Sequence, residues 1–128
     1  MDEPTRLRAR SWRHKFKDAL RGTRRAVRRE SSFFVHLFAA CAVLAAALAL
    51  GATLAEWCLL ILCICGVLTA EMFNTAFETL AKAIDREYNP HLRDALDMGS
   101  GAVLLAALGA SAVGAIIFIH RLASLLGW

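Results

Sequence analysis

Polar and charged residues are scarce in this 128-residue sequence. Only 20% of the residues are Asp, Glu, Lys or Arg, whereas 58% are hydrophobic, and the mean hydropathy is +0.49. A soluble domain of this size would have few polar side chains left to cover its surface. The length suits one domain, and no repeat or shift to a second composition marks another. The sequence therefore predicts a single membrane domain over residues 1–128.

Cysteine pairs with metal-ligand spacing are also lacking. The four cysteines lie in apolar runs, and none belongs to a CxxC motif. Cys63 and Cys65 would point to different sides of a helix. We interpret the cysteines as small packing residues, neither metal ligands nor a disulfide framework. The four cysteines, which do not indicate a redox compartment, are Cys41, Cys58, Cys63 and Cys65.

Basic residues, in contrast, are concentrated at the N-terminus. Eleven of the fifteen Lys and Arg residues fall within the first 29 positions. Within residues 5–30, Trp12, Phe16 and Leu20 recur every fourth residue and so line one face of a helix. This pattern predicts an amphipathic helix on the membrane surface, with its rings among the headgroups. A disordered basic tail is the alternative.

The position of this basic segment indicates its partner. Soluble proteins that bind nucleic acids also carry basic arms. Here the arm runs directly into an apolar segment. An anionic membrane surface is therefore the expected partner, and no nucleic-acid partner is expected.

Two apolar segments follow the basic arm. Residues 33–55 contain His36 as their only strongly polar member, and they can cross a hydrocarbon core of about 30 Å. A signal peptide is the alternative, but the roughly thirty preceding residues exceed an ordinary n-region. Residues 57–85 continue the helical pattern beyond the apolar run, up to the segment EYNPHL. Pro90 disfavours helix at the residue before it, so the helix is expected to break there.

A third apolar segment, residues 98–119, completes the predicted architecture. It carries a small-residue stripe suited to close helix packing, formed by Ala102, Ala106, Ala110 and Gly114. The sequence thus predicts an all-α membrane protein with three transmembrane helices and an N-terminal surface helix. The basic arm and the loop at residues 82–93 would be cytoplasmic, and the C-terminus would lie outside.

Polar side chains gather at the end of the second predicted span. At 100° per residue, Glu71, Asn74, Glu78, Lys82 and Asp85 fall within about 80° of arc. Glu71 would lie about 21 Å inward from the start of the span, just inside the cytoplasmic leaflet. Glu78 would lie about 10 Å further on, among the headgroups. A lipid hydroxyl could therefore reach Glu71, and a cytoplasmic solute could reach Glu78.

An acid within a span is costly, by roughly 2.5–3.5 kcal/mol at the centre, and is functional by default. Hydrogen bonding to neighbouring helices is the alternative for Glu71 and Asn74. A solvated helix end is the alternative for Glu78. Glu30 precedes the first span and would pair with Glu78 around one Mg²⁺, together with phosphate oxygens. A salt bridge to a nearby Arg is the alternative for Glu30.

Three stretches of the sequence together resemble one known family. They are EMFNTAFE, REYNPHLRDALDMGSGAVLLAA and FKDALRGTRRAVRRESSFFVHL. They resemble the prokaryotic integral-membrane diacylglycerol kinases, a family that includes undecaprenol kinases, over residues 16–119. The pattern E-x-x-N-[ST]-A-x-E beside a span is highly specific. The resemblance implies a homotrimer in a prokaryotic inner membrane that uses ATP to phosphorylate a lipid hydroxyl.

The resemblance also implies roles for individual residues. Glu71 matches the general base that takes the proton of the lipid hydroxyl, and Asn74 would orient the hydroxyl or the phosphate. Glu30 and Glu78 match the acids that hold Mg²⁺ on the ATP phosphates. Further positions near the nucleotide are matched by Glu87, Tyr88 and Asp97.

Two departures from the family pattern concern the nucleotide side. The family usually has Lys-Asp where this chain has Leu96-Asp97, and an Asp where this chain has Lys82. We hypothesise that Lys82 supplies the phosphate-directed charge that Leu96 cannot, and that Asp85 replaces the lost carboxylate. The sequence has no GxxxxGK[ST] loop. Phosphoryl transfer needs none, because it depends mainly on positioning and charge neutralisation.

The leading interpretation is a lipid kinase that converts diacylglycerol to phosphatidic acid. Undecaprenol is the alternative acceptor, and a catalytically inactive relative is a further alternative. A non-catalytic three-span assembly or channel subunit is the alternative from another class. A channel would carry polar residues along the full depth of a span, whereas here they occupy one end, which favours the kinase.

Overall fold

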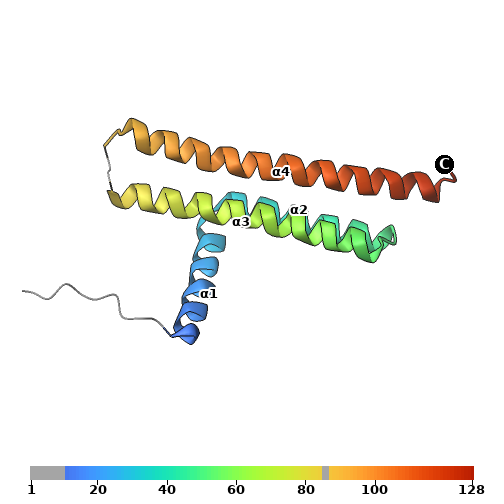
Figure 1. Cartoon of the computed structure of the whole chain (residues 1–128), viewed down its shortest axis with the longest axis horizontal. Coiled ribbons are helices and arrows are strands. Elements are labelled where there is room, and N and C mark those ends of the chain that lie inside the picture. Colours follow the sequence, from blue (N-terminus) through green and yellow to red (C-terminus); the bar gives the residue numbers. More distant parts are fainter. Residues whose placement is uncertain (1–10, 85–86) are drawn as a thin grey trace, which may run out of the picture.

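Four α-helices make up the part of the chain that the computed structural model describes, residues 11–84 and 87–128. Figure 1 shows α2, α3 and α4 side by side, with successive helices antiparallel, and α1 extending away from them, crosswise, from the start of α2. The predicted all-helical fold with three long apolar helices is confirmed. The N-terminal part of the predicted surface helix, residues 5–10, lies outside the described residues. The helices are α1 (Trp12–Arg29), α2 (Ser31–Ala49), α3 (Leu54–Ile84) and α4 (Pro90–Leu125).

By length and composition, α2, α3 and α4 can each cross a membrane. Their outer faces carry many exposed large apolar side chains, such as Phe38 at 79% and Leu105 at 73% exposure. Contiguous apolar surface of this kind marks a protein that contacts lipid or partner helices. The three helices therefore belong to a membrane protein.

The α2–α3 turn shortens the first apolar helix relative to the predicted span of residues 33–55. The helix ends at Ala49, and Gly51 follows with φ of +65°, a left-handed conformation that favours glycine. The next helix is started by a capping box. In this box Thr53 N donates to Glu56 Oε2 at 2.7 Å, and Glu56 N donates to Thr53 Oγ1 at 3.3 Å.

The last helix begins at Pro90, well before the predicted span of residues 98–119. Pro90 occupies the first turn, where its missing N–H costs nothing. The Asn89 side chain caps the helix by accepting hydrogen bonds from the backbone N–H groups of His91 and Leu92. The proline thus ends the connection and starts α4, so the break is narrower than the segment EYNPHL.

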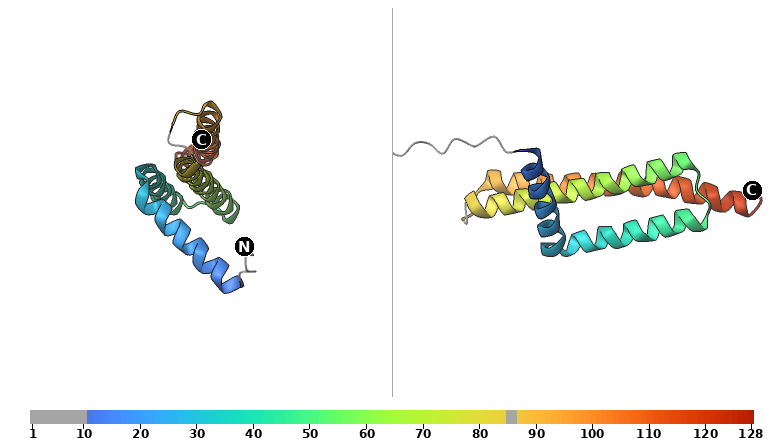
Figure 2. Two further views of the ribbon diagram at one scale, coloured as in Figure 1. Left: turned by 90° about the vertical axis from the view of Figure 1, so that its left-hand side faces the viewer. Right: turned by 90° about the horizontal axis from the view of Figure 1, so that it is seen from below.

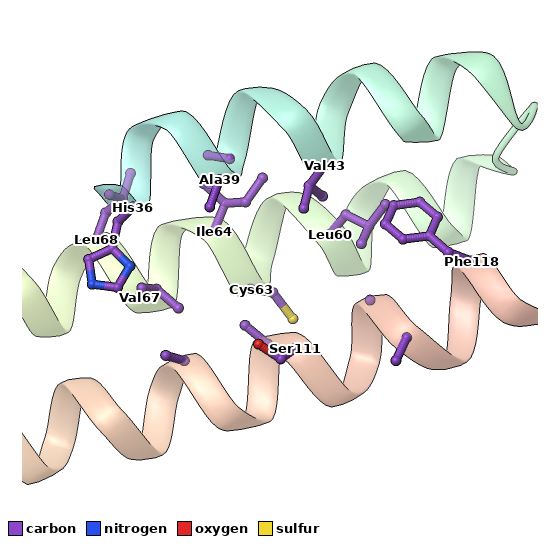
Figure 3. Close-up of a pocket in the computed structure, with 15 residues that line it drawn as sticks. His36, Ala39, Val43, Leu60, Cys63, Ile64, Val67, Leu68, Ser111 and Phe118 are labelled. Carbon is purple, nitrogen blue, oxygen red and sulfur yellow. The ribbon is translucent and has the colours of Figure 1, made fainter. Parts of the chain in front are cut away.

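The buried core lies toward the end of the bundle that holds the α2–α3 turn. Ala47, Leu60 and Ile117, one from each long helix, are its buried members. The α3 and α4 helices pack extensively, whereas α2 contacts α4 little. A groove of about 360 Å³ therefore remains between the three helices (Figure 3). Part of the predicted small-residue stripe, Ala110 and Gly114, lines this groove.

The two ends of the bundle differ in what they hold. The α2–α3 turn and the C-terminus share one end, and the start of α2 lies toward the other (Figures 1 and 2). The end of α3 and the start of α4 extend past the α1–α2 junction (Figure 1). These helix ends and the connection between them hold five of the nine residues for which the sequence predicts a role in the site, namely Glu78, Lys82, Glu87, Tyr88 and Asp97.

Candidate functional site

Glu71 is a buried acid on α3, with an exposure of only 3%. Ser32 Oγ of α2 donates a hydrogen bond to Glu71 Oε1. His36 Nε2, one turn further along α2, lies 3.7 Å from Glu71 Oε2. That separation exceeds the usual hydrogen-bond range of about 2.7–3.2 Å. One carboxylate oxygen is therefore held by α2, while the other faces a histidine without a direct bond.

Asn74 lies one turn beyond Glu71 and faces α4. Its Nδ2 donates to Glu78 Oε1 at 3.3 Å, while its Oδ1 is buried without a hydrogen-bond partner among the described residues. A Cβ atom on Gly99 would lie 2.7 Å from that oxygen. Alanine at position 99 would therefore require the Asn74 side chain to shift.

A hollow of about 810 Å³ lies between the end of α3 and the start of α4. Five of the residues predicted to bind the nucleotide line this hollow, and Arg93 and Leu96 also line it. Arg93 Nε lies 4.0 Å from Asp97 Oδ2, and both side chains are largely exposed. The hollow can therefore admit a charged solute, and its five predicted residues are Glu78, Lys82, Glu87, Tyr88 and Asp97.

The other predicted site residues lie outside this hollow. Glu71 and Asn74 lie earlier on α3, between the long helices. Glu30 is the single extended residue, φ −113° and ψ 118°, between α1 and α2. Asp85 lies outside the described residues.

Comparison with known proteins identifies the family. A family model described as prokaryotic diacylglycerol kinase matches residues 17–118. The chain belongs to this family. Family membership confirms the resemblance inferred from EMFNTAFE and its flanking stretches, and no solved structure matches the chain.

Two relatives of this diacylglycerol kinase family member are themselves named kinases. It is 34% identical over 107 residues to the undecaprenol kinase of Bacillus subtilis, covering 84% of this chain and 87% of the relative. It is 33% identical over 112 residues to a diacylglycerol kinase of Synechocystis sp., covering 87% of this chain and 64% of the relative. These relatives and the family model place the chain among the lipid kinases, in preference to a non-catalytic subunit.

Kinases of this family use ATP, whose phosphate charge is usually neutralised by a divalent cation, so side chains that could bind such a cation are relevant to the site. In the described ranges 11–84 and 87–128, no three His, Cys, Asp or Glu side chains form a group suited to a metal ion. Glu78 lines the hollow, whereas Glu30 lies outside it, and both offer carboxylate oxygens, the donor type that Mg²⁺ prefers. They fit a cation that takes its remaining ligands from phosphate oxygens and water.

Sequence reasoning missed Ser32, the role of His36 and Arg93. Ser32 and His36 are four residues apart, so they share one face of α2. Both of them contact or face Glu71. The only available signal was this spacing next to an acid in the following span. Arg93 could have been found as a second cation close to Leu96.

Proposed function

We propose that this lipid kinase transfers the γ-phosphate of ATP to diacylglycerol, giving phosphatidic acid. The observation that carries this proposal is the pairing of two environments along one helix. Glu71 is buried among apolar helices, and Glu78, about 10 Å further along α3, borders an open hollow with charged walls. A lipid hydroxyl and a dissolved nucleotide can therefore approach the same stretch of α3 from opposite directions.

In the proposed reaction, Glu71 Oε2 accepts the proton of the lipid hydroxyl. The hydroxyl oxygen forms a bond to the γ-phosphorus, while the bond from that phosphorus to the β–γ bridging oxygen breaks. ADP leaves with the electron pair of the broken bond. Asn74, which is tied to Glu78, orients the acceptor or the transferred phosphoryl group. Positioned general bases typically contribute about 10²–10⁴-fold to rate.

The nucleotide would occupy the hollow. We assign Glu30 and Glu78 to Mg²⁺, which when bound neutralises phosphate charge. The remaining predicted contacts to the nucleotide are Lys82, Asp85, Glu87, Tyr88 and Asp97. The position of Lys82 supports its assigned role, because it lines the same hollow as Leu96, where the family usually has a lysine.

The membrane environment and assembly state are part of the proposal. We assign α1 to an anionic membrane surface, because Trp12, Phe16 and Leu20 are 85%, 68% and 57% exposed beside many basic residues. We further propose a homotrimer in a prokaryotic inner membrane, with the N-terminus cytoplasmic and the C-terminus outside. The exposed apolar faces of α2, α3 and α4 support contacts with lipid and with other protomers.

Undecaprenol is the second candidate acceptor. It is favoured by the name of the Bacillus subtilis relative, which this chain matches over most of both lengths. Both lipids carry a hydroxyl at the membrane boundary and long apolar chains. The proposed roles of Glu71 and the hollow are the same for either acceptor.

The test is phosphate transfer by purified protein in lipid bilayers. With γ-labelled ATP and Mg²⁺, diacylglycerol and undecaprenol are offered in parallel to the natural chain and to Glu71→Gln. We expect label in diacylglycerol and a loss of roughly 10²–10⁴-fold in the variant, because glutamine accepts no proton. Label only in undecaprenol would transfer the proposal to the second acceptor. A folded natural protein that labels neither lipid would overturn it.

A further inference from the structure

Two side chains of α2 that the proposed function does not yet use lie beside the proposed base. Ser32 and His36 lie one helical turn apart and approach opposite oxygens of the Glu71 carboxylate. Figure 3 shows the His36 ring extending from α2 toward α3 beside Val67 and Leu68, at one end of the groove. Two polar side chains of α2 thus approach Glu71, which is only 3% exposed.

The two contacts differ in kind. Ser32 Oγ is hydrogen-bonded to Oε1, so this oxygen is oriented and partly neutralised. Oε2 forms no hydrogen bond with the residues that the structure describes, and it faces His36 Nε2 across 3.7 Å. A hydroxyl oxygen placed beside this gap can lie within about 2.7–3.0 Å of both atoms. The gap therefore suits an oxygen that donates to Oε2 and accepts from Nε2.

We propose that Ser32 and His36 complete the acceptor end of the active site. Ser32 is a positioning residue that holds Oε1 and turns Oε2 toward the lipid. His36 is a catalytic residue whose Nε2–H donates a hydrogen bond to the acceptor hydroxyl oxygen, while that hydroxyl donates to Glu71 Oε2. This inference rests on the proposed function, since it assumes that Glu71 receives the proton of a lipid hydroxyl.

Two hydrogen bonds, one to Glu71 and one from His36, would fix the orientation of the acceptor hydroxyl. A hydroxyl held only by Glu71 is free to rotate about a single hydrogen bond, which leaves the oxygen poorly aimed at the phosphorus. A second hydrogen bond from His36 removes that freedom, and alignment of the reacting atoms is a large part of catalysis. The nucleotide hollow lies further along α3, so ATP binding should not depend on either residue.

The test compares steady-state kinetics of paired variants in bilayers, with the lipid and ATP varied separately. His36→Gln places an amide N–H near the position of Nε2, whereas His36→Asn is too short to do so. Ser32→Thr keeps the hydroxyl, whereas Ser32→Ala removes it. The matched controls are Ser31→Ala, next to Ser32, and His120→Leu, an exposed histidine of α4 near the other end of the bundle. Thermal melting and oligomer size confirm that each variant is folded.

We expect His36→Asn to lower kcat/KM for the lipid by roughly tenfold, the equivalent of one hydrogen bond, without changing KM for ATP. His36→Gln should recover most of that loss. Ser32→Ala should lower kcat by roughly tenfold or more, because it frees the Glu71 carboxylate, and Ser32→Thr should restore it. The two controls should match the natural chain.

Other outcomes separate this inference from the proposed function. If Glu71→Gln abolishes transfer while Ser32→Ala and His36→Asn behave like the controls, the inference is overturned and the proposed function stands. Equal losses in His36→Gln and His36→Asn, or equal changes in KM for lipid and ATP, would also overturn it, since they indicate a structural role. If the natural chain phosphorylates no lipid, both fall together.

Discussion

Gly99 determines where the Asn74 side chain can lie. A methyl group at position 99 would lie 2.7 Å from Asn74 Oδ1 and 3.4 Å from Phe77 Cδ2. Gly99→Ala should therefore displace Asn74 and weaken its hydrogen bond to Glu78. We expect kcat to fall by roughly 100-fold, as for other small misplacements at a reacting centre. Steady-state lipid phosphorylation in bilayers measures this.

Gly101 provides the matched control for that substitution. It lies on the same helix, and no atom of residues 11–84 or 87–128 outside its own stretch of helix is within 4 Å of an added Cβ. Gly101→Ala should leave activity intact and slightly favour the helix, since alanine is the better helix former by about 1 kcal/mol. Comparable activity in the two variants would show that Asn74 need not hold its position.

Lys82 and Arg93 are two cations that line the hollow beside Leu96. Arg93 faces Asp97 at 4.0 Å, whereas no salt bridge involves Lys82 within the described part of the chain. Lys82→Ala should therefore raise KM for ATP by roughly tenfold or more, as expected for loss of a charge-assisted hydrogen bond to phosphate. Arg93→Ala should have a smaller effect. Equal and small changes in the two variants would refute the idea that Lys82 replaces the family lysine.

At the scale of the helix, one ion pair joins α3 to α4 at the end away from the candidate site. Arg121 Nε and Nη2 lie 2.8 and 2.5 Å from Glu56 Oε2, and the same carboxylate oxygen accepts from Thr53 N in the capping box. Arg121→Met should lower the melting temperature in detergent, because it leaves Glu56 without its cation. The melting temperature of Arg121→Lys should lie between those of the natural chain and Arg121→Met, because a lysine cannot reproduce the planar pair of N–H donors.

Activity distinguishes this stabilising role from a catalytic one. The ion pair lies near the start of α3, about 22 Å from Glu71 at 1.5 Å per residue. Activity per folded molecule should therefore be unchanged in Arg121→Met at low temperature. A variant that melts like the natural chain would show that the ion pair adds no net stability.

Helix identity was predictable from the sequence, whereas helix ends were less so. Long apolar runs predicted α2, α3 and α4, because a helix satisfies the backbone N–H and C=O groups of such a run within the membrane. The end of α2 depended on Gly51 adopting positive φ, which apolar run length does not reveal. The start of α4 depended on Asn89 capping the helix around Pro90. Both local features follow from turn and cap chemistry, which hydropathy ignores.

For the candidate site, helical spacing could predict which residues share a face of one helix, but not the contacts between helices. Helical spacing placed Glu71, Asn74 and Glu78 together, because they share one helix. The approach of Ser32 and His36 to Glu71 depends on how α2 packs against α3, which spacing within one helix cannot give. The roles of these residues remain predictions that the proposed experiments test.

At the scale of the whole molecule, charge asymmetry predicts the orientation of the bundle. Lys and Arg collect on cytoplasmic segments close to membrane spans. The basic α1 helix and the cations of the hollow lie toward the same end of the bundle (Figure 1). Arg121, toward the other end, is paired with Glu56, which lowers the cost of placing it there. The end with the hollow is therefore expected to face the cytoplasm, where ATP is available.

Two introduced cysteines test this orientation. Ser124, near the C-terminus, and Asp94, near the start of α4, are both exposed, and each is replaced by cysteine in a separate variant. A membrane-impermeant maleimide should label Ser124→Cys in intact spheroplasts, and Asp94→Cys only after lysis. The natural chain, with its four cysteines on the apolar helices, gives the background. The reverse pattern would place the hollow outside the cell, where an ATP-dependent kinase would lack its substrate, so this experiment tests the proposed function as well as the topology.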